Sequence, residues 1–245
     1  MLKMDPRLDI VGERLAGIGK IIPVSGGKGG VGKSVLSSCL ALSLARAGRK
    51  VGLLDLDLSS PSQHTILGAR DLFPKEDRGI LPPVFHGIHF MSLSFFTGDR
   101  PAPLRGTDIS NAIIELLAIT RWGELDRLVV DMPPGLSDAA LDVIRLMPKA
   151  ESLLVTVPSK VSFATVGKVI GIFQELGVRM AGVVENMVLS ESGFVRAESA
   201  RLGVPYLGAI PYDRGLEEAV GDPARLERTG VLSALEKVIA EAGGL

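Results

Sequence analysis

The stretch Ser25-Gly26-Gly27-Lys28-Gly29-Gly30-Val31-Gly32-Lys33-Ser34 is the most informative part of this 245-residue chain. It follows the apolar run 21–24 and precedes a helical pattern that extends over residues 35–47. Residues 27–34 fit G-x-x-x-x-G-K-S, the pattern of a phosphate-binding loop between a strand and a helix. Glycines let backbone N–H groups turn toward an anion, and the following helix presents its positive end to that anion. We therefore expect nucleotide phosphates to lie in this loop.

Three side chains of the loop carry specific expectations. Lys33 is expected to reach the β- and γ-phosphates, and the Ser34 hydroxyl is expected to bind Mg²⁺. Lys28 is a second lysine that the pattern does not require. From the residues alone, Lys28 is either a solvated loop charge or a group directed at another phosphate.

Short runs rich in Val, Ile and Leu alternate with longer helical patterns, which is typical of βαβ units around a parallel sheet. The expected strands are 20–25, 50–55, 88–94, 127–131, 152–157, 178–184 and 206–210. The expected helices are 33–47, 108–121, 137–147, 162–176, 214–220 and 231–242. Near-continuous apolar strands indicate that both faces of the sheet are covered. We predict an α/β fold with three layers, a mostly parallel twisted sheet with helices on both faces, as a single domain over residues 1–245.

Prolines mark two expected departures from this pattern. The stretch 71–87 contains Pro74, Pro82 and Pro83 and is predicted to be irregular. Pro23 lies within the first expected strand, where proline lacks the N–H that a central strand donates. We expect a local irregularity there, just before the phosphate-binding loop.

Carboxylates follow two of the expected strands. Asp55 and Asp57 come at the end of one strand, and Asp131 ends another. Ligands of an open parallel sheet lie beyond the carboxyl ends of its strands. Aspartates at such positions also serve as helix caps or turn residues. Because two strands carry them beside a phosphate-binding loop, we expect them to serve Mg²⁺ and the bound phosphates.

Composition limits the other function classes. The net charge is −1 and no cluster of Lys and Arg is present, so we expect no binding to nucleic acid. No apolar run approaches the length of a membrane span, and the amphipathic stretch 231–242 leans acidic, so we expect no stable membrane association and a cytoplasmic location. The single cysteine, Cys39, is expected to be a buried apolar residue of the first long helix.

The loop SGGKGGVGKS resembles the deviant Walker A motif of the MinD/ParA/Mrp group of P-loop ATPases. In that group the early lysine, here Lys28, crosses a dimer interface to the partner's nucleotide. Residues 52–57, 61–62, 122–126, 131–135 and 185–187 are similar, in the same order, to sequence blocks of the Mrp family. The resemblance implies an ATPase that converts ATP to ADP, uses Mg²⁺ and acts as a homodimer.

The resemblance also implies a role for each matching residue. Lys28, Lys33 and Asp57 would be catalytic, with Asp57 orienting or deprotonating the attacking water. Ser34 would bind Mg²⁺ directly and Asp131 through water, while 133–135 would form a second switch. The nucleotide would be held by Gly27, Lys28, Gly29, Gly30, Val31, Gly32, Lys33, Ser34, Val35, Asn186, Pro211, Tyr212 and Asp213, of which Asn186 would pair with the adenine edge and 211–213 would lie against the base.

One family feature is missing. Mrp proteins that carry iron–sulfur clusters have a C-x-x-C pair shortly after the Asn-Met block, whereas residues 188–200 contain no cysteine. Thiolates are the usual ligands of such clusters, which speaks against an iron–sulfur carrier. Residues 82–91, 100–106 and 113–126 resemble an archaeal subgroup of Mrp/MinD ATPases that serves nickel insertion into NiFe hydrogenase with a small nickel-binding chaperone.

The sequence therefore predicts a Mg-ATP-dependent dimeric switch in metallocentre assembly, with a metallochaperone or an apo-metalloprotein client as partner. Nickel insertion is the main expectation, and an iron–sulfur cluster carrier or scaffold is the alternative. The three histidines, His64, His86 and His89, are expected to be structural or surface residues rather than metal ligands. A spatial organiser like MinD or ParA would need a basic tail or patch, and a phosphoryl transferase would need an acceptor pocket that the sequence does not indicate.

Overall fold

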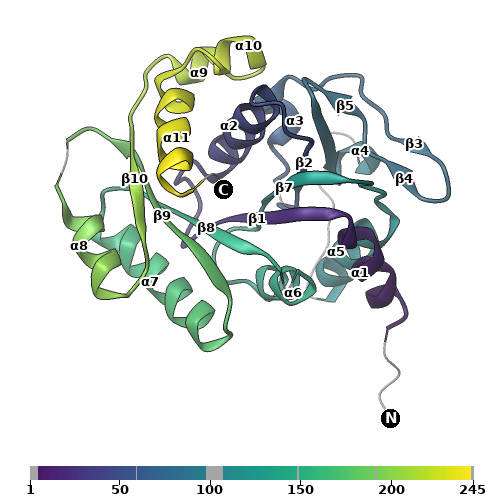
Figure 1. The fold of residues 1–245 in the computed structure, drawn as a ribbon, viewed down its shortest axis with the longest axis horizontal. Helices are drawn as coiled ribbons and strands as arrows, with labels where there is room; N and C mark the ends of the chain where they lie inside the picture. Colours follow the sequence, from purple (N-terminus) through teal and green to yellow (C-terminus); the bar gives the residue numbers. More distant parts are fainter. Residues whose placement is uncertain (1–4, 59, 98–106, 148, 191, 244–245) are drawn as a thin grey trace.

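An eight-stranded sheet with helices on both faces forms the computed structural model, which describes residues 5–58, 60–97, 107–147, 149–190 and 192–243 (Figure 1). The strand order is β10–β9–β8–β1–β7–β2–β6–β5. All neighbours run parallel except β5 and β6, which are antiparallel. The predicted three-layer α/β fold is confirmed.

The strands of the main sheet are β1 Ile18–Gly26, β2 Val51–Asp55, β5 Val84–Phe85, β6 Ile88–Ser92, β7 Leu125–Asp131, β8 Glu151–Thr156, β9 Arg179–Val188 and β10 Tyr206–Pro211. A separate hairpin pairs β3 Lys75–Glu76 with β4 Ile80–Leu81. The helices are α1 Arg7–Ala16, α2 Lys33–Arg46, α3 Gln63–Leu67, α4 Ser94–Thr97, α5 Thr107–Ile119, α6 Asp138–Leu146, α7 Lys160–Glu175, α8 Phe194–Arg201, α9 Leu216–Ala219, α10 Pro223–Leu226 and α11 Gly230–Glu241.

All seven expected strands and all six expected helices are present, with ends shifted by a few residues. The prediction of an irregular segment over 71–87 is wrong in part, because β3, β4 and β5 lie within it. Sequence periodicity also missed α1 and α8, and the short helices α3, α4 and α10. Residues 100–106, one of the blocks behind the nickel-related resemblance, lie outside the described residues.

Pro23 is a second correction, because β1 continues through it without a break. Pro23 is opposite Val130 of β7, and Val24 accepts a hydrogen bond from Met132 on that side. Since successive residues of a strand direct their backbone groups to opposite sides, the missing N–H of Pro23 lies toward β8. Pairing of β1 with β8 begins only at Val24, so no ladder bond is lost there.

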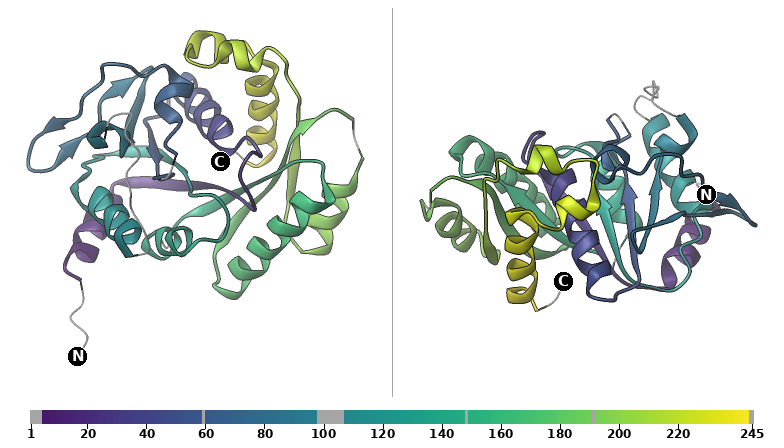
Figure 2. Two further views of the ribbon diagram at one scale, coloured as in Figure 1. Left: turned by 180° about the vertical axis from the view of Figure 1, so that it is seen from behind. Right: turned by 90° about the horizontal axis from the view of Figure 1, so that it is seen from above.

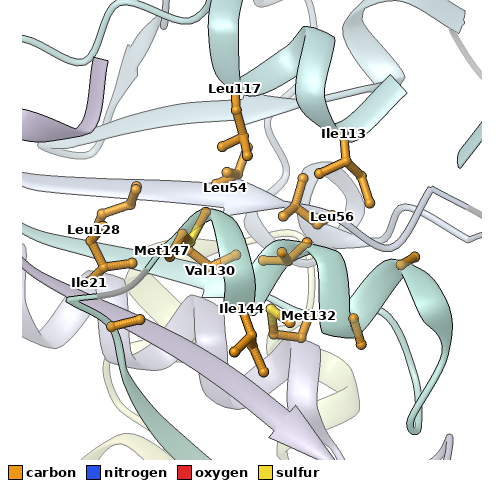
Figure 3. Packing of buried hydrophobic residues seen from close by; sticks show 14 of the residues in the cluster. Ile21, Leu54, Leu56, Ile113, Leu117, Leu128, Val130, Met132, Ile144 and Met147 are labelled. Atoms are coloured by element: carbon orange, nitrogen blue, oxygen red, sulfur yellow. The ribbon is translucent and has the colours of Figure 1, made fainter. Parts of the chain in front are cut away.

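Two apolar layers hold the helices to the sheet. Figures 1 and 2 show α2 and α11 on one face and α1, α5, α6, α7 and α8 on the other. On the second face, Leu54, Leu128 and Val130 of the strands, with Leu56 just after β2, meet side chains of α5 and α6 (Figure 3). Cys39 is a fully buried residue of α2, as predicted. Within the described residues, no helix has the length and apolar character that crossing a membrane requires.

The packing predicts that Leu117→Ala destabilises the fold by about 2–5 kcal/mol, the usual cost of a cavity at a fully buried leucine. Leu117 lies on α5 above Leu54 and is 0% exposed. Urea unfolding followed by circular dichroism measures the loss. Leu176→Ala, at a leucine 48% exposed after α7, is the matched control and should change the free energy of unfolding little. Equal effects of the two substitutions would contradict the assigned packing.

Candidate functional site

The phosphate-binding loop connects the end of β1 to the start of α2, at the carboxyl edge of the sheet. Gly30 and Gly32 have φ values of +79° and +82°, a region that favours glycine. A Cβ on Gly32 would overlap Asn186 Nδ2, and a Cβ on Gly27 would lie 2.5 Å from the backbone nitrogen of Val166. One side of the loop is therefore packed against β9 and α7 so closely that only glycine fits.

The other side of the loop is open. A Cβ added to Gly29 or Gly30 would meet no atom within 4 Å, and Lys28, Gly29 and Gly30 are exposed. Backbone N–H groups next to a helix N-terminus and without side-chain obstruction form the usual cradle for a phosphate. The loop as folded fits the predicted phosphate.

A buried ion pair lies beneath the loop. The Lys33 ammonium is 2.6 Å from Asp131 Oδ1, and the two residues are 7% and 0% exposed. The single hydroxyl proton of Ser37 is shared between the Lys33 carbonyl at 3.0 Å and the same carboxylate oxygen at 3.3 Å. Because β7 is the direct neighbour of β1, its last residue lies under the loop that leaves β1. The structure thus brings together two residues predicted from the sequence, Lys33 and Asp131.

Gln63, which sequence reasoning did not single out, completes this arrangement. Its side-chain Nε2 donates to Asp131 Oδ2 at 2.8 Å and to the Ser34 carbonyl at 2.9 Å. Its Oε1 accepts from the Ser38 hydroxyl. Gln63 follows Pro61-Ser62, a block used for the family resemblance, but a buried glutamine has no sequence pattern of its own.

Asp55 is a second buried carboxylate of the site. It accepts hydrogen bonds from the backbone N–H groups of Asp57 at 3.1 Å and of Ser62 and Gln63 at 3.2 Å each. Burial, followed by the nearby charge of Asp131, raises the pKa of Asp55 to about 7, although the backbone donors act in the opposite direction. These hydrogen bonds tie Asp57, Ser62 and Gln63 to the end of β2.

The remaining residues predicted to act on phosphate or metal lie at the same edge. Asp57 is partly exposed, and its carboxylate accepts from Ser60 N–H at 3.2 Å. Among the described residues, the Ser34 hydroxyl and the Lys28 ammonium have no hydrogen-bond or ion-pair partner within the subunit.

No group of three or more His, Cys, Asp or Glu side chains in the described ranges is placed to hold a metal. Mg²⁺ needs only one or two protein oxygens when phosphates supply others, so Ser34 and Asp131 fit it.

The residues predicted to contact adenine lie on β9 and after β10. Asn186 is buried, and its amide donates to the Val31 carbonyl of the loop at 2.9 Å. Pro211 and Tyr212 are exposed. Asp213 accepts from Gly215 N–H at 2.9 Å and Gly230 N–H at 2.8 Å, and so holds the start of α11. Their roles toward the base stay predictions.

The chain is similar to known P-loop NTPases. A family model described as "ParA: NUBPL iron-transfer P-loop NTPase" matches residues 17–240. The chain belongs to this family. It is 36% identical over 233 residues to an iron-sulfur cluster carrier protein of Pseudomonas fragi, covering 85% of this chain and 81% of the relative. It is 40% identical over 226 residues to the human cytosolic Fe-S cluster assembly factor NUBP2, covering 82% of each chain.

Solved structures agree with the family fold. A nucleotide-binding protein from Archaeoglobus fulgidus in complex with ADP has a TM-score of 0.76 and 31% identity, covering 90% of this chain and 92% of that one. The septum site-determining protein MinD from Pyrococcus horikoshii, complexed with Mg-ADP, has a TM-score of 0.68 and 21% identity, covering 89% and 93%. The predicted cofactors, ATP or ADP with Mg²⁺, agree with what these structures hold.

The comparisons correct the main functional prediction. The relatives are named for iron–sulfur clusters, not for nickel insertion or hydrogenase maturation, and the prediction of that role and of a nickel chaperone is wrong. Much of the nickel-related resemblance rested on residues with a structural role. Ile113, Leu117 and Trp122 are core residues that pack α5 and the start of β7 on the sheet.

The raised pKa of Asp55 predicts a pH-dependent stability in the protein free of nucleotide and Mg²⁺. Because the pKa of Asp55 in the folded protein exceeds the ordinary aspartate value of 3.8, the stability that protonated Asp55 contributes is complete below about pH 4 and is lost as the pH rises through about 7. Asn at this position cannot ionise. The free energy of unfolding of Asp55→Asn minus that of wild type should therefore rise by on the order of a few kcal/mol between pH 4 and 8. Any other effect of the substitution on stability should add to this difference by an amount that does not change with pH. Parallel pH curves from urea unfolding would contradict the assignment.

Proposed function

We propose that this chain is a Mg-ATP-dependent ATPase switch that acts as a homodimer in iron–sulfur cluster assembly. The observation that carries the nucleotide part is the open glycine loop above the buried Lys33–Asp131 pair. Membership of the iron-transfer P-loop NTPases supports the connection to clusters.

The site suggests how the chain's own residues act on the nucleotide. Backbone N–H groups of the loop bind the phosphates. The Lys33 ammonium leaves Asp131 and contacts the β- and γ-phosphates. Asp131, released from the lysine, and the Ser34 hydroxyl are the residues that would hold Mg²⁺ beside the phosphates. Mg²⁺, when bound, neutralises phosphate charge and supports phosphoryl transfer. Asp57, partly exposed beside the loop, orients or deprotonates the attacking water.

The exposure of Lys28 supports a homodimer. An ammonium group on the open side of the loop, without an ion-pair partner among the described residues of its own subunit, is free to reach the nucleotide of a facing subunit. A cation that approaches the phosphates from a second subunit stabilises the transition-state charge. Hydrolysis would then weaken the dimer and change the surface that a partner meets.

The burial of the single cysteine bears on which protein would hold an iron–sulfur cluster. Cys39 is the single cysteine of this sequence, is 0% exposed, and burial raises the pKa of its thiol to about 12. Iron–sulfur clusters bind thiolates, so Cys39 does not fit as a cluster ligand. We therefore assign the cluster to a partner, either an apo-protein client or a scaffold, on which the nucleotide state of this chain acts.

Turnover of Lys28→Ala tests the dimeric switch. The variant should lose at least about tenfold in kcat, because a charge at the transition state is removed, while it still binds nucleotide through Lys33. Steady-state phosphate release, measured over a range of protein concentrations, gives the activity, and analytical ultracentrifugation with an ATP analogue gives self-association. Lys75→Ala, at an exposed lysine of β3, is the control. Unchanged turnover and self-association in Lys28→Ala would remove the cross-dimer role.

Cluster reconstitution tests where the thiolates come from. After anaerobic incubation with ferrous iron, sulfide and reductant, the chain alone should retain only substoichiometric iron and lack cluster absorption, and Cys39→Ser should behave identically. ATP-loaded protein should retain identified iron–sulfur apo-proteins on an affinity column better than ADP-loaded protein. A stoichiometric cluster on the chain alone, lost in Cys39→Ser, would overturn the partner-held cluster. Retention of other protein classes alone would overturn the role in cluster assembly.

A further inference from the structure

Gln63 is 0% exposed, and both N–H groups and the oxygen of its side-chain amide are hydrogen-bonded. The two N–H groups of Nε2 go to Asp131 Oδ2 and the Ser34 carbonyl, and Oε1 receives the Ser38 hydroxyl. The backbone N–H of Gln63 donates to Asp55 Oδ2 at 3.2 Å. One residue thus joins the end of β2, the end of β7 and the first turns of α2.

The chemistry of these contacts requires an amide. Two of the neighbours, Asp131 Oδ2 and the Ser34 carbonyl, are acceptors, and the third, the Ser38 hydroxyl, is able to donate. Only Asn and Gln offer two donors and an acceptor on one uncharged planar group. A glutamate would place a second carboxylate against Asp131, and a methionine of similar length would leave the acceptors without a donor.

The two oxygens of Asp131 are held by different groups. Lys33 and Ser37 hold Oδ1, at 2.6 and 3.3 Å, whereas Gln63 holds Oδ2. When Lys33 turns to the phosphates, as the proposed function requires, Asp131 loses its cationic partner among the described residues. A buried carboxylate without a compensating partner is costly and would turn toward another donor. Gln63 is the main donor that remains, because Ser37 shares its one hydroxyl proton with the Lys33 carbonyl.

We propose that Gln63 is the positioning residue that keeps Asp131 oriented for Mg²⁺ after Lys33 has moved to the nucleotide. Gln63 also ends the segment that begins at Asp55 and contains Asp57, and this segment is tied to Asp55 at both ends. The backbone N–H of Gln63 therefore ties the segment that carries Asp57 to Asp55, while the side-chain amide of the same residue holds Asp131. This inference rests on the proposed nucleotide-binding function.

Gln63→Met and Gln63→Glu separate this role from simple packing. Methionine keeps the length and adds no charge, so it is the main test, and glutamate keeps the shape but repels Asp131. Binding of a fluorescent ADP analogue is measured with EDTA and across a Mg²⁺ titration, below the unfolding temperature of each variant. Phosphate release across the same Mg²⁺ range gives kcat and the half-saturating Mg²⁺ concentration.

For Gln63→Met, affinity in EDTA should stay within about twofold of wild type, because the loop and Lys33 are intact. The Mg²⁺ concentration at half-saturation should rise about tenfold, as expected for one lost hydrogen bond to a charged group. The kcat should recover at high Mg²⁺, and Gln63→Glu should shift further in the same direction. Ser38→Ala, which removes only the Oε1 contact, should shift the half-saturating Mg²⁺ concentration much less.

An unchanged Mg²⁺ dependence in Gln63→Met would overturn the inference. So would an equal loss of affinity with and without Mg²⁺, which is the signature of a packing role. Failure of the proposed function looks different, because the wild-type protein itself would then bind no nucleotide under either condition.

Discussion

The buried ion pair between Lys33 and Asp131 is the interaction around which the site is arranged. Removing two charges from water costs several kcal/mol for each ion, and their contact at 2.6 Å offsets this only while both partners stay in place. The strand order provides the contact, because β7 lies beside β1 and its last residue is under the loop. A ligand that draws Lys33 away therefore forces Asp131 to find another partner. This requirement links phosphate binding to metal binding.

The neighbouring polar groups lower the energetic cost of moving Lys33 away from Asp131. Asp55, whose pKa burial raises to about 7, gains a proton readily and so limits the negative charge beside Asp131. Gln63 holds the second oxygen of Asp131 with an uncharged group. Gln63 and Asp57 are both hydrogen-bonded to Asp55, and Asp57 is partly exposed, so a change at Asp131 is linked through Gln63 and Asp55 to a residue at the surface.

The sequence predicted the parts of this arrangement that have a local signature. Residues 27–34 and the strand-end Asp131 were found because a phosphate loop has a fixed spacing and parallel strands end at one edge. Gln63 was missed because its role depends on three contacts that are distant in sequence. Pro23 was misjudged because its tolerance depends on where β8 starts to pair with β1. The nickel prediction is wrong because the relatives are named for iron–sulfur clusters, and residues behind it such as Trp122 and Leu117 are buried in the core.

A crystal structure of the chain with Mg²⁺ and a non-hydrolysable ATP analogue tests the central claim most directly. The account predicts that Lys33 Nζ leaves Asp131 Oδ1 and contacts the β- and γ-phosphates, while Asp131 Oδ2 stays hydrogen-bonded to Gln63. An analogue seated in the loop with the Lys33–Asp131 contact still closed would contradict it.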